Sequence, residues 1–427
     1  MRTPADRSKR PTFALHGWTG QISPMNFAAR KVIRNWRMKL QQSMITRMIA
    51  MLIATAVILG QPGTVVAMGP RPPLLTAQVV AAPDPMIAFD KAYAVYELVL
   101  TSFDSRPIEL TSLRVTDADN SQIVSMFSGR ELASMVAPVG PDTEGLATSF
   151  GTGQVRIVYL WLPFSDANHV PRRITHILQC KVGPPPGELY EIALAPMPVE
   201  QAPPLSIGPP LRGGDWIAEG GPSNSSYHRR ARMVGNGIIY FAQRFAIDYV
   251  KISADGRTYS GDRKNNSNYL CYGSDVLAVA DGKVVATKDG IPENTPDPIA
   301  RAVDITMETA GGNFVALDIG YGRYALYGHL IPGSLKVKAG DSVKRGQVLA
   351  HLGNSGNSTE PHLHFQIADA PSFLLANGFP YLYDQVDVRP ASVTDAASDP
   401  PVIQATGPAK RYLATMLLEN DLVDFPQ

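Results

Sequence analysis

Two histidines, His362 and His364, are separated by a single residue near the C-terminal end of the sequence. In a β-strand, successive side chains point to opposite faces, so both imidazoles are expected on one face while Leu363 and Phe365 face a core. Two imidazoles on one face can bind a metal ion or transfer protons. The pair alone does not distinguish these two roles.

Two further residues supply side chains of the same chemical kind. His329 closes an apolar stretch that begins at Tyr324, and Asp248 closes another that follows Arg244. Each lies at a predicted strand end or in a turn-rich segment. We therefore expect three histidines and one aspartate to converge on one cleft.

Four segments around these residues form a recognisable set, namely 278–287, 327–330, 340–350 and 353–365. Together they resemble the lysostaphin and LytM family of zinc metallopeptidases, and the resemblance covers roughly residues 240–370. The segment 340–350 alone also resembles biotinyl and lipoyl carrier domains. A carrier domain, however, has no use for three histidines.

The resemblance implies a zinc ion held by Asp248, by His364 and by a third histidine four residues before the aspartate. It also implies that His329 and His362 are catalytic and support the attack of water on a peptide carbonyl. The implied substrates are peptidoglycan cross-bridges or stem peptides. Zinc chemistry agrees with this ligand set, because a catalytic zinc keeps three protein ligands and one open position for water.

One position departs from the family pattern. Arg244 stands where the third ligand is expected, and a guanidinium does not release its proton to bind a metal. His228 is the candidate replacement, because a hairpin with residues 235–237 as its loop would place it opposite Arg244. A one-residue change of register would turn His228 to the other face. An exposed, merely polar His228 is the alternative.

Two functions therefore remain open. A complete site predicts a zinc metalloendopeptidase that hydrolyses peptide bonds, with peptidoglycan as the substrate class. Loss of a ligand predicts a catalytically inactive module that binds cell wall or regulates another wall hydrolase. The joint presence of Asp248, His329, His362 and His364 favours the enzyme, since a module freed from catalysis has no chemical need for all four.

The elements that position these residues are expected to be short β-strands. A chain of 427 residues exceeds the roughly 250 to 300 at which single cores stop growing, so two folded units are expected. Strand-like runs predict a β-sandwich-like domain over residues 80–200. Similar runs over 215–390 predict an antiparallel β metallopeptidase domain. The predicted fold class is therefore mostly β.

Two segments complete the predicted organisation. Residues 183–214 are rich in proline and glycine, which predicts an interdomain linker, with room for one last strand at 190–194. Residues 391–427 are predicted to be a C-terminal extension, in which 412–422 form a short helix or strand with no evident chemistry.

The N-terminal residues 1–67 have the order of a secretory signal peptide with a long basic region. Lysines and arginines between 31 and 47 precede an apolar run, 48–59. This run is shorter than the roughly 18 to 20 residues that span a bilayer, so a removed signal is expected and a membrane anchor is the alternative. The protein is therefore expected to be exported to the periplasm or cell envelope, or secreted.

Composition constrains the partners only weakly. The chain is 44% hydrophobic and 18% charged, and its formal net charge of +1 gives no electrostatic reason to expect nucleic acid. In an oxidising compartment, Cys180 and Cys271 are either one disulfide or two buried thiols. The oligomeric state is left open by the sequence.

Overall fold

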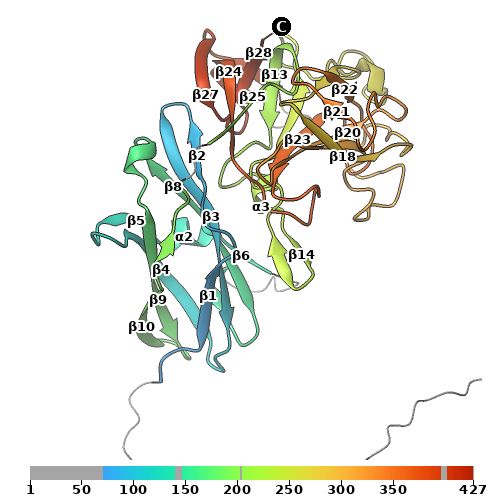
Figure 1. Cartoon of the computed structure of the whole chain (residues 1–427). Coiled ribbons are helices and arrows are strands. Elements are labelled where there is room, and N and C mark those ends of the chain that lie inside the picture. Colours follow the sequence, from blue (N-terminus) through green and yellow to red (C-terminus); the bar gives the residue numbers. More distant parts are fainter. Residues whose placement is uncertain (1–70, 140–146, 202–203, 396–401, 427) are drawn as a thin grey trace, which may run out of the picture. The chain divides into compact units, whose positions relative to one another are not determined.

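The computed structural model describes residues 71–139, 147–201, 204–395 and 402–426 (Figure 1). The chain divides into two units, Met1–Arg71 and Pro72–Gln427, and the description below concerns the second. The predicted signal segment 1–67 lies outside the described residues, so it stays a prediction. Among the described residues, no helix has the length and apolarity needed to cross a membrane. The mostly β fold class is confirmed, because strands dominate and the helices are short.

The first part of Pro72–Gln427 contains two facing antiparallel sheets. One sheet has the order β1-β3-β8-β6, with β2 paired to β3; its strands are β1 (Leu75–Val79), β2 (Pro85–Ala88), β3 (Lys91–Ser102), β6 (Val136–Pro138) and β8 (Val155–Phe164). The other has the order β10-β9-β4-β5, with β11 paired to β9 and β7 to β4; its strands are β4 (Ile108–Asp117), β5 (Ile123–Ser128), β7 (Ser149–Phe150), β9 (Arg173–Val182), β10 (Glu188–Ala193) and β11 (Met197–Pro198). Helix α2 (Gly129–Met135) follows β5, and a short 3-10 turn, Ala167–His169, follows β8.

The two sheets enclose one apolar core. Strand β9 alternates exposed or half-buried with buried side chains, as expected for a strand with one face on a core. Strand β3 is buried almost along its whole length, so its second face is covered as well. On that second face, Val95 and Val99 join apolar clusters that include residues of the C-terminal half of the chain.

The second part is built on one eleven-stranded sheet, coloured from green to red in Figure 1. Its order is β12-β24-β28-β13-β16-β23-β20-β19-β18-β21, and β27 pairs with β24. The strands are β12 (Leu205–Ile207), β13 (Gly213–Glu219), β16 (Ile247–Lys251), β18 (Gly282–Lys288), β19 (Asn313–Asp318), β20 (Tyr324–Leu330), β21 (Ser342–Val343), β23 (Leu363–Ala368), β24 (Tyr381–Arg389), β27 (Lys410–Thr415) and β28 (Leu422–Phe425). Every pair in this sheet is antiparallel except β12 with β24.

Several smaller elements of this part of the chain lie outside the eleven-stranded sheet. They are the short helix α3 (Tyr227–Arg230), the 3-10 turn Asn266–Asn268, and three two-stranded pairs: β14 (Met233–Gly235) with β15 (Ile238–Tyr240), β17 (Asp275–Leu277) with β22 (Val348–His351), and β25 (Ala391–Asp395) with β26 (Val402–Ala405). Helix α3 and the β14–β15 hairpin both precede β16 in the chain.

The predicted linker and the predicted C-terminal extension both contribute strands. Within residues 183–214, β10 and β11 pair with β9, and β12 pairs with β24. Within residues 391–427, β28 lies between β24 and β13. Strands β10 and β12 themselves contain no proline and lie at sheet edges, so the prolines before and after them do not interrupt their pairing. The boundaries 80–200 and 215–390 stay a prediction.

The two cysteines do not form a disulfide. Cys180 is buried in the core of the two facing sheets, and Cys271 is buried in the core of the large sheet. Of the two alternatives, two buried thiols is therefore the one that the structure has.

Candidate metal centre

Three adjacent strands of the large sheet carry the centre of the site. Strand β23 lies between β16 and β20, so Asp248 on β16 stands directly opposite His364 on β23. On the other side, His364 stands opposite Gly328 of β20, the residue before His329. The expected alternation holds, because Leu363 and Phe365 point into the core.

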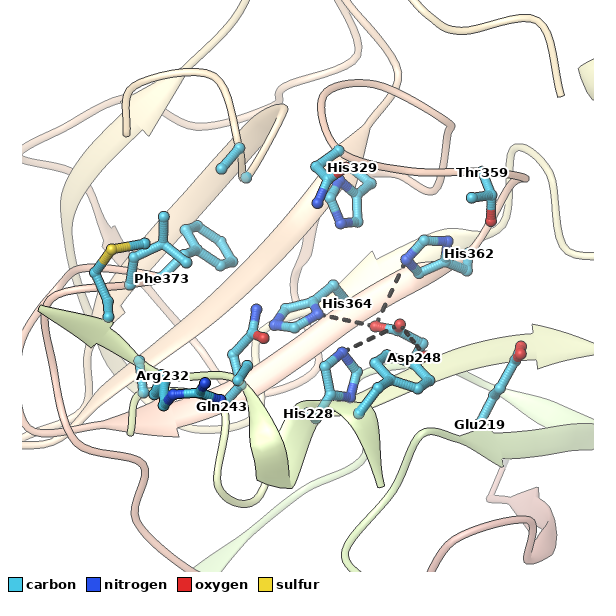
Figure 2. Close-up of a pocket in the computed structure, with 18 of the residues that line it drawn as sticks. Glu219, His228, Arg232, Gln243, Asp248, His329, Thr359, His362, His364 and Phe373 are labelled. Atoms are coloured by element: carbon cyan, nitrogen blue, oxygen red, sulfur yellow. Dashed lines mark hydrogen bonds and ion pairs between the residues drawn. The ribbon is translucent and has the colours of Figure 1, made fainter. Parts of the chain in front are cut away.

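Asp248 is the centre of the cluster in Figure 2, where His228, His362 and His364 surround its two carboxylate oxygens. The Nδ1 atom of His364 lies 2.8 Å from Oδ1, and the Nε2 atom of His362 lies 3.5 Å from the same oxygen. The Nε2 atom of His228 lies 3.3 Å from Oδ2. All four side chains are buried, with at most 8% of any residue exposed.

His228 reaches the site by a route other than the predicted hairpin. It lies in helix α3, and the hairpin pairs Gly235 with Ile238, so the turn contains two residues instead of three. The predicted loop of 235–237 and the pairing of His228 with Arg244 were therefore wrong. The reason is that Asn236 and Gly237 both have positive φ, 51° and 77°, which an Asn-Gly turn of two residues requires.

Arg244 does not line the cavity that contains the histidines. It is 3% exposed, and its guanidinium pairs with the carboxylate of Glu97 on β3. The neighbouring Gln243 faces the cavity instead.

Each imidazole of the site has one nitrogen occupied by an oxygen acceptor. Nδ1 of His228 lies 2.9 Å from the Gly220 carbonyl oxygen, and Nε2 of His364 lies 2.8 Å from Oε1 of Gln366. An oxygen acceptor holds the ring proton on that nitrogen, which leaves the other nitrogen free to bind a metal. For these two residues, the free nitrogens are those that face Asp248.

The same arrangement applies to the two predicted catalytic histidines. Nδ1 of His329 donates to the Ser355 carbonyl oxygen at 2.7 Å, and Nδ1 of His362 donates to the Glu360 carbonyl oxygen at 2.8 Å. In the neutral rings, Nε2 therefore carries a lone pair. The ring centroids of His329 and His362 are 4.7 Å apart, so the two lie side by side.

Burial and mutual charge set the protonation of the cluster. Burial alone would raise the pKa of Asp248, but the facing His228, His362 and His364 outweigh it and hold that pKa well below its usual value. Burial lowers the pKa of His329 well below its usual value, and neighbouring histidines add to the effect. At neutral pH, Asp248 is therefore a carboxylate and His329 a neutral imidazole.

His228, Asp248 and His364 fit a zinc ion. One ligand atom from each lies within 4.8 Å of the other two, and all three residues are buried. Two imidazoles and a carboxylate are a donor set that zinc prefers, and ligand atoms around one tetrahedral zinc lie roughly 3.3 Å apart. The distances of 2.8 and 3.3 Å to Asp248 are close to that separation.

The cavity beside these residues has a volume of about 550 Å³, which suits a short peptide. Two of its residues carried no signal in the sequence. Tyr227 donates its hydroxyl to Oδ2 of Asp248 at 2.7 Å. Glu219 lies on β13, directly opposite Asp248 on β16. Burial, together with the charges of Glu360 and Asp248, raises the pKa of Glu219 to about 8.

Residues 269–373 match the sequence model described as Peptidase family M23. The predicted resemblance to metallopeptidases of the lysostaphin and LytM type is confirmed for this part of the chain. The matched segment contains His329, His362 and His364, whereas His228 and Asp248 precede it.

Three curated relatives are similar to parts of this chain. Endolysin 2638A of Staphylococcus phage 2638A is 31% identical over 153 residues, 29% of this chain and 28% of the relative. Glycyl-glycine endopeptidase ALE-1 of Staphylococcus capitis is 33% identical over 99 residues, 23% of this chain and 22% of the relative. Cell division protein DipM of Caulobacter vibrioides is 28% identical over 167 residues, 39% of this chain and 23% of the relative. The chain thus spans about a quarter of the length of each relative.

Two solved structures are similar to part of the chain. The catalytic domain of lysostaphin from Staphylococcus simulans aligns with 39% of this chain and 88% of its own, at 23% identity and a TM-score of 0.22. A mutant catalytic domain of the prophage-encoded M23 protein EnpA from Enterococcus faecalis aligns with 38% of this chain and 85% of its own, at 20% identity and a TM-score of 0.22.

Proposed function

We propose that this chain is a zinc metalloendopeptidase that hydrolyses peptide bonds in peptidoglycan. The observation that carries the proposal is the buried cluster of His228, Asp248 and His364 beside His329 and His362. In this proposal, His228 supplies the third ligand in place of the histidine that the family resemblance leads one to expect at position 244. The match of residues 269–373 to Peptidase family M23 supports the reaction class.

The proposed mechanism assigns separate tasks to the five residues. Nε2 of His228, the carboxylate of Asp248 and Nδ1 of His364 would hold the metal. When bound, zinc supplies a Lewis acid that polarises the peptide carbonyl and lowers the pKa of water. His362 and His329 are assigned catalytic roles, because each presents an Nε2 lone pair toward the site. One imidazole would accept a proton from the attacking water and then donate it to the leaving amine, while the other would hydrogen-bond the reacting oxygen.

The substrate class and the location follow from the names of the relatives. One is an endolysin, one a glycyl-glycine endopeptidase and one a cell division protein. These names support peptide bonds of peptidoglycan as the target, and the periplasm or cell envelope as the place of action. They give no reason to add nucleic acid as a partner.

Metal content and wall hydrolysis, measured on the same full chain, test the proposal. We expect about one zinc per chain and a loss of turbidity when peptidoglycan is added, abolished by a chelator and restored by zinc. Zinc binding without release of new amino termini from peptidoglycan would instead favour the inactive module that binds wall or regulates another hydrolase.

A further inference from the structure

We infer that Glu97 is a positioning residue for the metal centre, acting from a different sheet through Arg229 and Arg244. The inference rests on the proposed function, since it concerns the same zinc site. It makes the facing sheets of the first part of the chain a structural component of that site.

Glu97 lies in the middle of β3, on the face that carries Val95 and Val99. These two neighbours are apolar and buried, so a carboxylate between them has no use in packing alone. The Glu97 side chain is completely buried, and an unpaired carboxylate in such a position is strongly destabilising even after the protein relaxes around it. Its presence therefore requires cationic partners.

Two arginines supply those partners. Oε1 of Glu97 pairs with Nη1 of Arg229 and accepts a hydrogen bond from Nε of Arg244 at 2.9 Å, while Oε2 pairs with Nη2 of Arg244. Nη2 of Arg229 also donates to the carbonyl oxygens of Tyr96 at 2.8 Å and Leu160 at 3.3 Å. Arg229 is thus fixed to the adjacent strands β3 and β8.

The two arginines stand next to two metal ligands in the chain. Arg229 directly follows His228 in α3, and Arg244 precedes Asp248 by four residues. One carboxylate therefore holds both the helix that carries His228 and the turn that leads to Asp248. This also gives position 244 a role that a histidine ligand cannot have, because only a long permanent cation reaches Glu97.

Helix α3 needs such an anchor. It has only four residues, which is far below the length at which a helix is stable by itself, and Ser226 makes no side-chain cap to it. Successive residues of a helix point about 100° apart, so fixing Arg229 toward β3 leaves His228 directed to the other side, toward Asp248. Within α3, Tyr227 contacts Asp248 and His228 contacts the Gly220 carbonyl oxygen, and Glu97 adds the contact that fixes the helix to β3 from its other side.

The test compares two buried carboxylates of the same sheet region. Glu97→Gln removes the charge beside the site, whereas Asp104→Asn removes a buried carboxylate that pairs with Arg106 away from the site. Zinc affinity of the full chain is measured by chelator competition. We expect Glu97→Gln to weaken it about 10- to 100-fold, and Asp104→Asn to leave it within about twofold.

A second readout needs no metal. The amide hydrogens of Arg230 and Ala231 donate to Ser226 and Tyr227 carbonyl oxygens within the α3 turn. In metal-free protein, we expect these amides to exchange faster in Glu97→Gln than in the wild type or in Asp104→Asn.

A milder substitution covers the case in which Glu97→Gln does not fold. Arg229→Lys keeps the charge, but its single ammonium nitrogen cannot take the places of both Nη1 at Glu97 and Nη2 at the two carbonyl oxygens. We therefore expect this variant also to bind zinc more weakly. Arg106→Lys is its control. The inference alone would be overturned if Glu97→Gln and Arg229→Lys both kept wild-type zinc affinity and wild-type amide exchange in α3 while His228→Ala bound zinc more weakly. Full zinc binding by His228→Ala would overturn the proposed ligand set instead.

Discussion

At the scale of single residues, the site depends on how Asp248 is surrounded. Its two oxygens face three imidazoles and one phenol, and no other aspartate or glutamate of the described residues has such a set of partners. Each imidazole is oriented by an oxygen on its far side, so the lone pairs that face Asp248 are already in place before a ligand arrives.

The first prediction concerns the three proposed ligands. We expect about one zinc per wild-type chain, loss of zinc in His364→Ala, and weaker binding in His228→Ala, because each substitution removes one of three protein donors. Metal content after gel filtration and chelator competition measure this. His169→Ala is the control, since His169 is exposed and pairs only with Asp166. Unchanged zinc in His228→Ala would remove His228 from the ligand set.

The second prediction separates catalysis from metal binding. His329→Ala is expected to keep its zinc and to lower kcat about 10²- to 10⁴-fold, because a proton acceptor is lost while the three ligands remain. His351→Ala is a suitable control, since His351 is half-buried and pairs with Asp275 outside the cavity. Undiminished hydrolysis of peptidoglycan by His329→Ala would contradict the mechanism.

Strand alternation and the family resemblance were enough to predict that His329, His362, His364 and Asp248 meet. His228 could be named from the sequence but not placed, because its position depends on α3 and on Glu97, more than 130 residues away in the chain. Tyr227 and Glu219 could not be found at all, since an isolated tyrosine or glutamate has no spacing that marks it.

At the scale of elements, two loops hold the imidazole of His329, proposed to be catalytic, by close backbone contact. Gly312 and Gly356 both have positive φ and pack against each other at the start of β19. A Cβ on Gly312 would lie 2.3 Å from the carbonyl oxygen of Ser355, which accepts the proton of His329 Nδ1. His329 itself has a φ of 63°, a strained value for a residue with a side chain.

The third prediction uses this contact. Gly312→Ala is expected to displace Ser355, to tilt His329 and to lower kcat about 10- to 100-fold with zinc retained. Gly322→Ala is the matched control, because Gly322 has a similar φ of 67° but no atom within 4 Å of the added Cβ. Equal kcat for the two variants would show that backbone strain alone, and not the Ser355 contact, matters.

The fourth prediction concerns the hydrogen bond that joins the two facing sheets. Nε2 of His176 on β9 lies 2.7 Å from the Tyr96 hydroxyl on β3, and burial lowers the pKa of His176 from 6.5 to about 4. Between these values the unfolded chain binds more protons than the folded one, so stability is present above pH 6.5 and falls as the pH drops toward 4.

His176→Gln removes this titration and keeps a hydrogen-bonding side chain. Relative to this variant, the wild-type free energy of unfolding should fall by up to about 1.4 kcal/mol per pH unit within the window. Urea denaturation of both proteins at pH 7, 6 and 5 measures the difference. If the free energies of unfolding of the two proteins changed in parallel with pH, the assignment of this titration to His176 would be contradicted.

Among elements, the strands were easier to predict than their registers. The hydrophobic pattern located β20 and β23, whereas Asp248 was expected at the end of an apolar run and instead lies near the start of β16. The β14–β15 turn was one residue shorter than expected. The Asn-Gly pair forms the turn by itself, and a sequence in which Gly235 and Gly237 flank Asn236 does not show whether two or three residues make the loop.

At the scale of the whole molecule, residues far apart in the sequence complete one sheet. Strand β28 pairs with β13 and β24, and Phe425 packs its ring against Tyr249 and Tyr383 at centroid distances of 5.6 and 5.4 Å. Tyr249 directly follows Asp248, so the core beneath the metal centre includes this strand.

The fifth prediction follows from that packing. Phe425→Ala is expected to lower the free energy of unfolding by roughly 3 to 5 kcal/mol, since Phe425 is 3% exposed. Leu413→Ala on β27 is the control and should change it by at most about 0.5 kcal/mol, because Leu413 is 69% exposed. Denaturant midpoints measure both, and a small loss in Phe425→Ala would show that β28 is dispensable.

Composition indicated a proline-rich stretch and a polar C-terminal stretch, each with room for one short strand. It did not indicate which strands of the sheets these segments pair with. Pairing between distant strands is decided by tertiary packing, which local composition does not report.

The place of β28 also has a consequence for how the protein is made. Strand β13 needs β28 on one edge and β16 on the other, so the support of Asp248 is incomplete while residues 422–425 are still unsynthesised. A nascent chain on the ribosome can therefore contain all three proposed ligands while the sheet beneath Asp248 is still unfinished. Under the proposed function, we expect metal loading to follow synthesis of the C-terminal strand, and a chain stalled before that strand to bind zinc less stably.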